Sequence, residues 1–138
     1  MRRQKAAGKL PPTGGEVVKP VVWMGSSRKD LSRMPASVKQ VFGFAIFPAQ
    51  RGEAHPDARP MKGFGGSATV MELKEDFMSD TWRAMYTVKL GDGVHVLHCF
   101  RKKSTAGTST PKLEIDVIAR RLGDAVRLHA QRTKESGR

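Results

Sequence analysis

The chain has 138 residues, with 25 Lys or Arg against 13 Asp or Glu, and this length suits one domain with tails. The resulting net charge of +12 makes polyanions the expected partners, with nucleic acid ahead of an acidic protein. No apolar run approaches the roughly 20 residues of a membrane helix and Cys99 is the only cysteine, so we exclude a membrane protein and a disulfide-rich one and expect a cytoplasmic protein.

The first 20 residues combine basic side chains with Gly and Pro, a composition that cannot bury enough apolar surface to fold. We therefore predict a flexible basic arm over residues 1–20, one domain over residues 21–131 and a basic tail over residues 132–138. The charge supports this division, because residues 21–100 are nearly neutral and both ends are strongly basic.

Two helices are predicted at the start of the domain. Ser27 is the expected N-cap of the first, because Asp30 three residues later completes a capping box, and Pro35 ends this helix. The second helix follows Pro35, and Pro48 should kink or end it early, because proline lacks the N–H and clashes with the preceding turn. Apolar residues recur at helical spacing on the face expected to meet the core: Val38, Val41, Phe42, Ala45, Ile46 and Ala49.

A turn-rich loop is predicted over residues 53–66. Three runs rich in β-branched and aromatic residues follow it, at 67–76, 81–90 and 93–103. Thr110 and Pro111 then start a final helix. This order predicts an α+β domain in which two N-terminal helices pack on an antiparallel β-meander of three or more strands, followed by a C-terminal helix. The opposite face of the sheet would then be free to bind a partner.

Several motifs in this chain occur together in one known family. They are Glu-Leu-Lys at 72–74, the Arg-x-x-Tyr strand with Arg83 and Tyr86, and Phe-x-Lys-Lys at 100–103 leading into Thr-Pro at 110–111. In this order, after a helical hairpin, they resemble the RelE/ParE superfamily of bacterial type II toxins, in particular its phage-related HigB-like branch. The resemblance covers about Val21 to Leu122 and leaves the N-terminal arm outside it.

The resemblance implies an mRNA interferase, a toxin that cleaves messenger RNA on the ribosome without a metal or other cofactor. Its expected partners are messenger RNA and a cognate antitoxin, a small helix-turn-helix protein. A metal site is also disfavoured by the residues, because His95 and His98 point to opposite faces of one strand and the single Cys99 cannot complete a zinc set. Two alternatives stay open, a ParE-like DNA gyrase inhibitor with the same fold and a phage-derived protein that binds nucleic acid without chemistry.

Metal-free cleavage of RNA directs the ribose 2′-OH at the neighbouring phosphate, and therefore needs a base, cations and an acid. Strand alternation directs Arg83 to the face opposite the N-terminal helices, where its guanidinium could hold a phosphate through two hydrogen bonds. Arg83 also matches the catalytic arginine of the family's ribonuclease members. The resemblance implies Glu72 as the base, because related toxins use a glutamate near this position. A structural alternative stays open for both, because Glu72 and Arg83 could simply form a cross-strand ion pair.

The third predicted strand leaves two arrangements open for His98. Facing outward with Phe100, it would be a possible general acid or base beside Arg83 and Lys102, and facing inward it would be a core histidine. Tyr86 lies on the expected core face and is the weakest catalytic candidate. Lys102 completes the predicted catalytic set. The predicted RNA-binding surround consists of Lys74, Lys89, Arg101 and Lys103.

Overall fold

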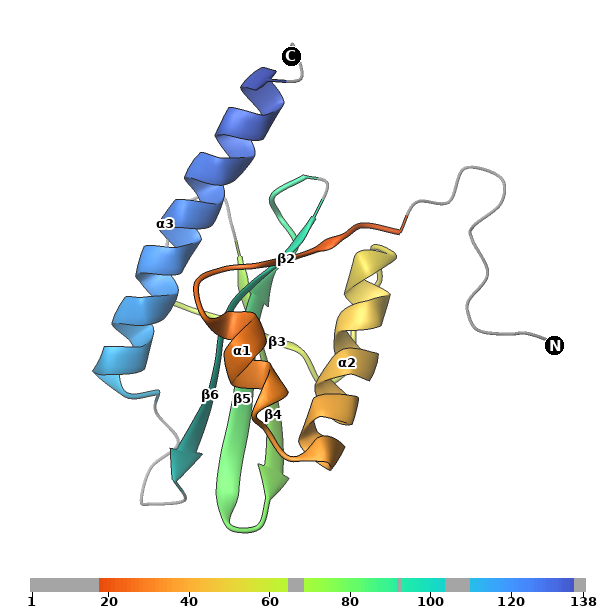
Figure 1. Cartoon of the computed structure of the whole chain (residues 1–138), viewed down its shortest axis with the longest axis vertical. Coiled ribbons are helices and arrows are strands. Elements are labelled where there is room, and N and C mark those ends of the chain that lie inside the picture. Colours follow the sequence, from red (N-terminus) through yellow and green to blue (C-terminus); the bar gives the residue numbers. More distant parts are fainter. Residues whose placement is uncertain (1–17, 65–68, 92, 104–109, 136–138) are drawn as a thin grey trace, which may run out of the picture.

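The structure, a computed structural model, describes residues 18–64, 69–91, 93–103 and 110–135. Five strands form one sheet in the order β2-β6-β5-β4-β3, and helices lie on both of its faces (Figure 1). In chain order the elements are β2 (Val21–Trp23), α1 (Ser27–Ser32), α2 (Ala36–Gln50), β3 (Arg59–Met61), β4 (Val70–Phe77), β5 (Asp80–Thr87), β6 (Val94–Lys103) and α3 (Lys112–Glu135). The sheet is therefore the middle layer of three.

The sheet is mixed, which corrects the predicted antiparallel meander. β2 runs parallel to β6, with Val21 opposite Val94, whereas the other neighbouring strands are antiparallel. The two strands that the sequence did not reveal, β2 and β3, are each three residues long. Three residues are too few for a recognisable alternation of apolar and polar side chains, and β3 also contains Pro60.

Each face of the sheet has its own apolar core. The core under α2 contains Val38, Phe42, Ala45, Ile46, Ala49, Leu73, Ala84, Tyr86 and Val96. The core under α3 contains Val70, Met85, Leu97, Phe100, Ile118, Leu122 and Ala125. The prediction that the second face of the sheet is free was wrong, because α3 buries its apolar stripe there instead of standing apart from the sheet.

The start of α1 corrects the predicted cap by one residue. Ser26, not Ser27, is the N-cap, and its hydroxyl donates a hydrogen bond of 2.7 Å to Asp30 Oδ2. Ser27 is buried, and its hydroxyl donates to the Val96 carbonyl at 3.1 Å. Ser26 lies four residues before Asp30 and so lacks the capping-box spacing, and the contact that buries Ser27 against β6 is not visible in the sequence.

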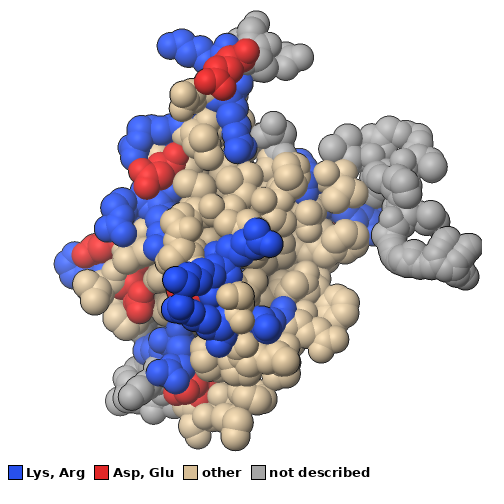
Figure 2. Space-filling model, in the orientation of Figure 1, with Lys and Arg blue, Asp and Glu red and all other residues tan. Residues whose placement is uncertain are grey.

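Basic side chains are concentrated over α1. Figure 2 shows Lys and Arg gathered in the middle of the face on which α1 lies. α1 is only six residues long and carries Arg28 and Lys29, and Arg33 follows directly as its C-cap. All three of these side chains are exposed. This helix therefore presents a positive surface to solvent.

α2 extends to Gln50 and passes through Pro48, so of the two predicted effects, a kink or an early end, the early end is wrong. Because Pro48 lies in the last turn, the backbone hydrogen bond it removes is one of the last in the helix. The helix end is held from outside, since the Lys19 N–H donates to the Gln50 carbonyl and the Gln50 side chain donates to the Lys19 carbonyl, both at 2.8 Å. Val41 is exposed, because it lies beyond the edge of the buried stripe.

The ends of the chain bear on the predicted domain limits in two ways. α3 continues to Glu135 and so includes residues 132–135, which we assigned to a tail. Residues 1–17 of the predicted arm lie outside the described residues. In the described part of the chain no helix combines the length and the apolar character needed to cross a membrane.

Candidate functional site

Arg83 and Glu72 form an ion pair at the centre of the candidate site. They lie on β5 and β4, on the sheet face that α3 covers, since Glu72 stands opposite Met85 of the core under α3. Arg83 Nη1 donates to Glu72 Oε2 at 2.7 Å and to Thr110 Oγ1 at 2.9 Å. The two side chains are only 4% and 13% exposed. The ion pair considered as a structural alternative is thus present, and it buries the guanidinium.

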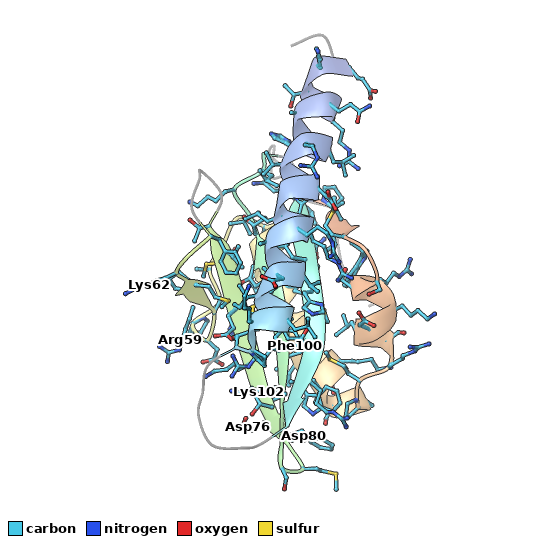
Figure 3. All side chains as sticks on the ribbon, turned by 90° about the vertical axis from the view of Figure 1, so that its left-hand side faces the viewer. Arg59, Lys62, Asp76, Asp80, Phe100 and Lys102 are labelled. Atoms are coloured by element: carbon cyan, nitrogen blue, oxygen red, sulfur yellow. The ribbon has the colours of Figure 1, made fainter. Side chains whose placement is uncertain are left out.

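Lys102 lies on the same face of the sheet. It stands opposite Thr81 in the ladder between β5 and β6, and Phe100 stands opposite Arg83. Figure 3 shows Phe100 beside the first turn of α3 and Lys102 farther along the sheet, beyond the helix. Lys102 is partly exposed, whereas Phe100 is buried. Lys102 is therefore the predicted catalytic cation that solvent can reach.

A small pocket opens beside Glu72 at the β3 edge of the sheet. Its volume is about 180 Å³, and its walls are Asp57, Arg59, Glu72 and Lys74. Arg59 stands opposite Glu72 in the ladder between β3 and β4, and Figure 3 shows it projecting from the edge of the sheet. Glu72 Oε1 accepts no hydrogen bond from the residues that the structure describes. This carboxylate oxygen is thus available to a molecule in the pocket, between two cationic side chains.

His98 is held between a carboxylate and a guanidinium from α3. Its Nε2 lies 2.7 Å from Glu114 Oε1, and its Nδ1 lies 3.3 Å from Arg121 Nη1. Because a guanidinium only donates hydrogen bonds, Nδ1 is the acceptor and the ring proton is on Nε2. His98 also stacks on Phe100, with ring centroids 4.7 Å apart. His98 therefore shares the face of Arg83, but α3 buries it and both of its nitrogens have partners.

Arg121 extends this network to α1. Its guanidinium donates to the Leu97 carbonyl at 3.1 Å and to Ser26 Oγ at 3.0 Å. One side chain of α3 thus contacts both β6 and the N-cap of α1. Arg121 was not predicted, because a cation on an amphipathic helix has no distinguishing pattern. Arg59 was not predicted, because it lies in the segment expected to be a loop.

Tyr86 lies away from this site. It packs in the core under α2, on the opposite face of the sheet from Glu72, and burial raises its pKa. Cys99 is buried in the same core, and burial, with a smaller contribution from the charge of Asp30, raises the pKa of its thiol to about 12. Tyr86 therefore does not reach the pocket beside Glu72, and Cys99 is an unreactive thiol.

Two of the predicted RNA-binding residues, Lys74 and Arg101, line different pockets. Lys74 lines the pocket beside Glu72, and Lys89 is exposed just after β5. Arg101 lies over the ring of Trp82, 5.7 Å from its centroid, with Asp80 Oδ2 3.5 Å away. The side chain of Lys103 lies outside the described residues. Among the side chains that are described, no group of three His, Cys, Asp or Glu is arranged to hold a metal ion.

The comparison with protein families gives a match over most of this site. The family described as phage-derived Gp49-like proteins (DUF891) matches residues 29–123, from α1 to the middle of α3. The chain belongs to this family. Gp49-like proteins form a RelE-like, toxin-like family, so the predicted resemblance is confirmed at that level, and the HigB-like branch stays a prediction. The Gp49-like match includes Glu72, Arg83 and Lys102. Neither a curated protein nor a solved structure matches the chain.

Proposed function

We propose that this Gp49-like protein is the toxin of a type II toxin–antitoxin system and cleaves messenger RNA without a metal. The observation that carries the proposal is the Glu72 carboxylate, held by Arg83 at 2.7 Å in the wall of a pocket that also contains Arg59 and Lys74. Membership of a toxin-like family supports the toxin role. The net charge of +12 supports a nucleic-acid substrate. The ribosome as the place of action and a helix-turn-helix antitoxin are parts of the same proposal.

In this mechanism Glu72 removes the proton from a ribose 2′-OH, and the 2′-oxygen attacks the adjacent phosphorus. The bond from phosphorus to the 5′-oxygen of the next nucleotide breaks, and that oxygen takes a proton from a water molecule, which in turn takes the proton held by Glu72. The products are a 2′,3′-cyclic phosphate and a 5′-hydroxyl. Arg59 and Lys74 line the pocket with Glu72 and stabilise the negative charge that develops on the phosphate oxygens.

Arg83 acts in this mechanism as a positioning residue. Its guanidinium is almost fully buried and bonds to Glu72 and Thr110, so it fixes the carboxylate rather than the substrate. Lys102 is partly exposed on the same face, and we assign it to a phosphate of the RNA beyond the first turn of α3. A buried partner that holds the catalytic base in place is a common way to keep catalytic geometry fixed.

The burial of Arg83 also favours a second candidate, a protein that binds nucleic acid without cutting it. A guanidinium that is 4% exposed and hydrogen-bonded to Glu72 and Thr110 can serve the fold alone. In that case the carboxylate of Glu72 would be the partner that makes burial of the guanidinium tolerable. The two candidates differ in one outcome, because only the first requires new ends in messenger RNA.

The test is induced expression in a bacterial host of the wild type, of Glu72→Gln and of the matched control Glu75→Gln. Glu75 lies on the same strand but stands opposite Trp82, on the face of the sheet away from the pocket. We expect growth arrest and new messenger ends with the wild type and with Glu75→Gln, and no new ends with Glu72→Gln at equal soluble yield. Arrest with intact messengers would favour a gyrase-type target, and normal growth would favour the non-catalytic candidate.

A further inference from the structure

A second pocket lies toward the opposite edge of the sheet from Glu72, and the proposed chemistry does not use it. Its volume is about 390 Å³, which is within the usual range of roughly 300–1,000 Å³ for small-molecule sites. Its walls come from α1, β5, β6 and the first turn of α3. We call it the edge pocket, and the residues that matter for its chemistry are Asp30, Arg33, Trp82, Arg101 and Glu114.

The edge pocket exists because β6 is longer than the strand beside it. β2 pairs with β6 only at Val94 to Val96, so the described residues supply no strand neighbour farther along this edge. Four successive residues of β6, His98 to Arg101, line the pocket. Because successive side chains of a strand point to opposite faces, a cavity that touches all four wraps around the strand edge. The pocket therefore occupies the gap between β6 and α1.

Two guanidiniums give the edge pocket a positive rim. Arg33 is exposed next to α1 and makes no ion pair with the part of the chain that the structure describes. Arg101 lies on the other side, over Trp82, with the Asp80 carboxylate 3.5 Å away. Arg33, as the C-cap of α1, belongs to the positive surface of that helix. Such a rim attracts a phosphate backbone, and a guanidinium can hold one phosphate through two hydrogen bonds.

The interior of the edge pocket suits a flat ring that donates hydrogen bonds. Trp82 is partly exposed, and a base can stack on an indole. Asp30 and Glu114 each use one carboxylate oxygen, on Ser26 and His98. The other oxygen of each can accept from the amino group of a base.

We propose that the edge pocket binds one nucleotide of single-stranded RNA, with its phosphate on Arg33 and Arg101 and its base against Trp82, Asp30 and Glu114. Cytosine, adenine and guanine carry amino groups, so they bind there better than uracil does. The proposal rests on the proposed function in taking RNA as the ligand, but it requires no cleavage. β6 lies two strands from β4, about 10 Å across the sheet. The pocket would thus select the base near the phosphate that Glu72 cleaves.

The test is the binding of RNA heptamers with 2′-O-methyl riboses, which the 2′-OH mechanism cannot cleave. The chain has two tryptophans, so Trp23→Phe leaves Trp82 as the only indole. We expect the cytosine heptamer to quench Trp82 fluorescence and to bind several-fold more tightly than the uracil heptamer. Arg33→Ala and Arg101→Ala should each weaken binding by about tenfold, the usual effect of losing a charged hydrogen bond. Arg28→Ala removes an exposed cation of α1 that does not line the pocket, and should weaken binding by less than about threefold.

The outcomes separate this proposal from the proposed function. RNA binding without quenching of Trp82, or with equal losses for Arg33→Ala and Arg28→Ala, would overturn the edge pocket and leave RNA as the substrate. Equal affinity for the cytosine and uracil heptamers would overturn the role of the two carboxylates. Absence of binding to either heptamer would overturn the edge pocket, whereas the proposed cleavage is tested separately by the new messenger ends. The urea midpoint of each variant must match that of the wild type, and Arg33→Lys is a second variant that keeps the charge.

Discussion

The buried ion pair between Arg83 and Glu72 leads to a prediction about stability that is independent of catalysis. Arg83→Met removes the cation and leaves the Glu72 carboxylate 13% exposed and without its partner. Breaking one side of a buried pair costs about 3–5 kcal/mol. Because the pocket beside Glu72 gives water some access to the carboxylate, we expect the lower end, about 3 kcal/mol. Replacing both partners with methionine should lower the free energy of unfolding by less than Arg83→Met alone, since hydrophobic replacement of a buried pair is often close to neutral.

The assay is equilibrium unfolding in urea, followed by tryptophan fluorescence, for Arg83→Met, Glu72→Met and the double variant. The account predicts a coupling energy of about 2 kcal/mol between the two positions and a melting temperature about 10 °C lower for Arg83→Met. A loss below about 1 kcal/mol for Arg83→Met, or strictly additive losses, would refute the reasoning. Such a result would mean that the guanidinium is not held by the carboxylate in solution.

Three further predictions concern the core under α2 and the start of α1. Phe42 is fully buried and Phe44 is 68% exposed on the same helix. In urea unfolding, Phe42→Ala should therefore lower the free energy of unfolding by about 3–5 kcal/mol and Phe44→Ala by under about 0.5 kcal/mol. Equal losses would contradict the assigned face of α2. Gly25 has φ +54, and a Cβ there would clash with the Arg121 guanidinium. Gly25→Ala should therefore lower the free energy of unfolding by about 1–2 kcal/mol, and by less when Arg121 is also replaced by alanine. An unchanged loss in the Arg121→Ala background would exclude the clash. Burial raises the pKa of Cys99 in the folded protein to about 12, above its ordinary value near 9. The neutral thiol therefore contributes fully to stability below pH 9, and this contribution is lost as the pH rises toward 12. Stability of the wild type should therefore fall faster with alkaline pH than that of Cys99→Ala, and parallel curves would show that the thiol is not buried.

The sequence predicted the fold incorrectly for physical reasons that particular elements illustrate. Long strands were recognised: β5 was expected at 81–90 and lies at Asp80–Thr87, since eight residues of alternating character are enough to identify a strand. β2 owes its place to pairing with β6 rather than to its own three residues. The apolar stripe of α3 was visible in the sequence, but which surface it covers depends on where the chain returns after β6. The predicted layers were wrong because tertiary packing, not local propensity, decides which face of the sheet α3 covers.

Part of the candidate site followed from strand alternation. It places Glu72 and Arg83 on one face of the sheet, and they do share that face. The sequence left the face of Lys102 open, and the pairing of β6 with β5 puts it on the same face as Arg83. It could not reveal that Thr110 and α3 would enclose Arg83. The contribution of Arg59 and the edge pocket beside β6 depend on unpredicted pairings at the two edges of the sheet. Local pattern therefore indicates which residues can meet, and tertiary structure decides which of them solvent can reach.

The central claim, metal-free cleavage of RNA by Glu72, is tested most directly by the chemistry of the cut ends. RNA from cells that briefly express the wild type, Glu72→Gln or Glu75→Gln would be ligated to an adapter with and without prior phosphorylation of 5′ ends. The account predicts new downstream fragments that carry a 5′-hydroxyl and ligate only after phosphorylation, present with the wild type and Glu75→Gln and absent with Glu72→Gln. New fragments that carry a 5′-phosphate, or the same fragments with Glu72→Gln, would contradict it.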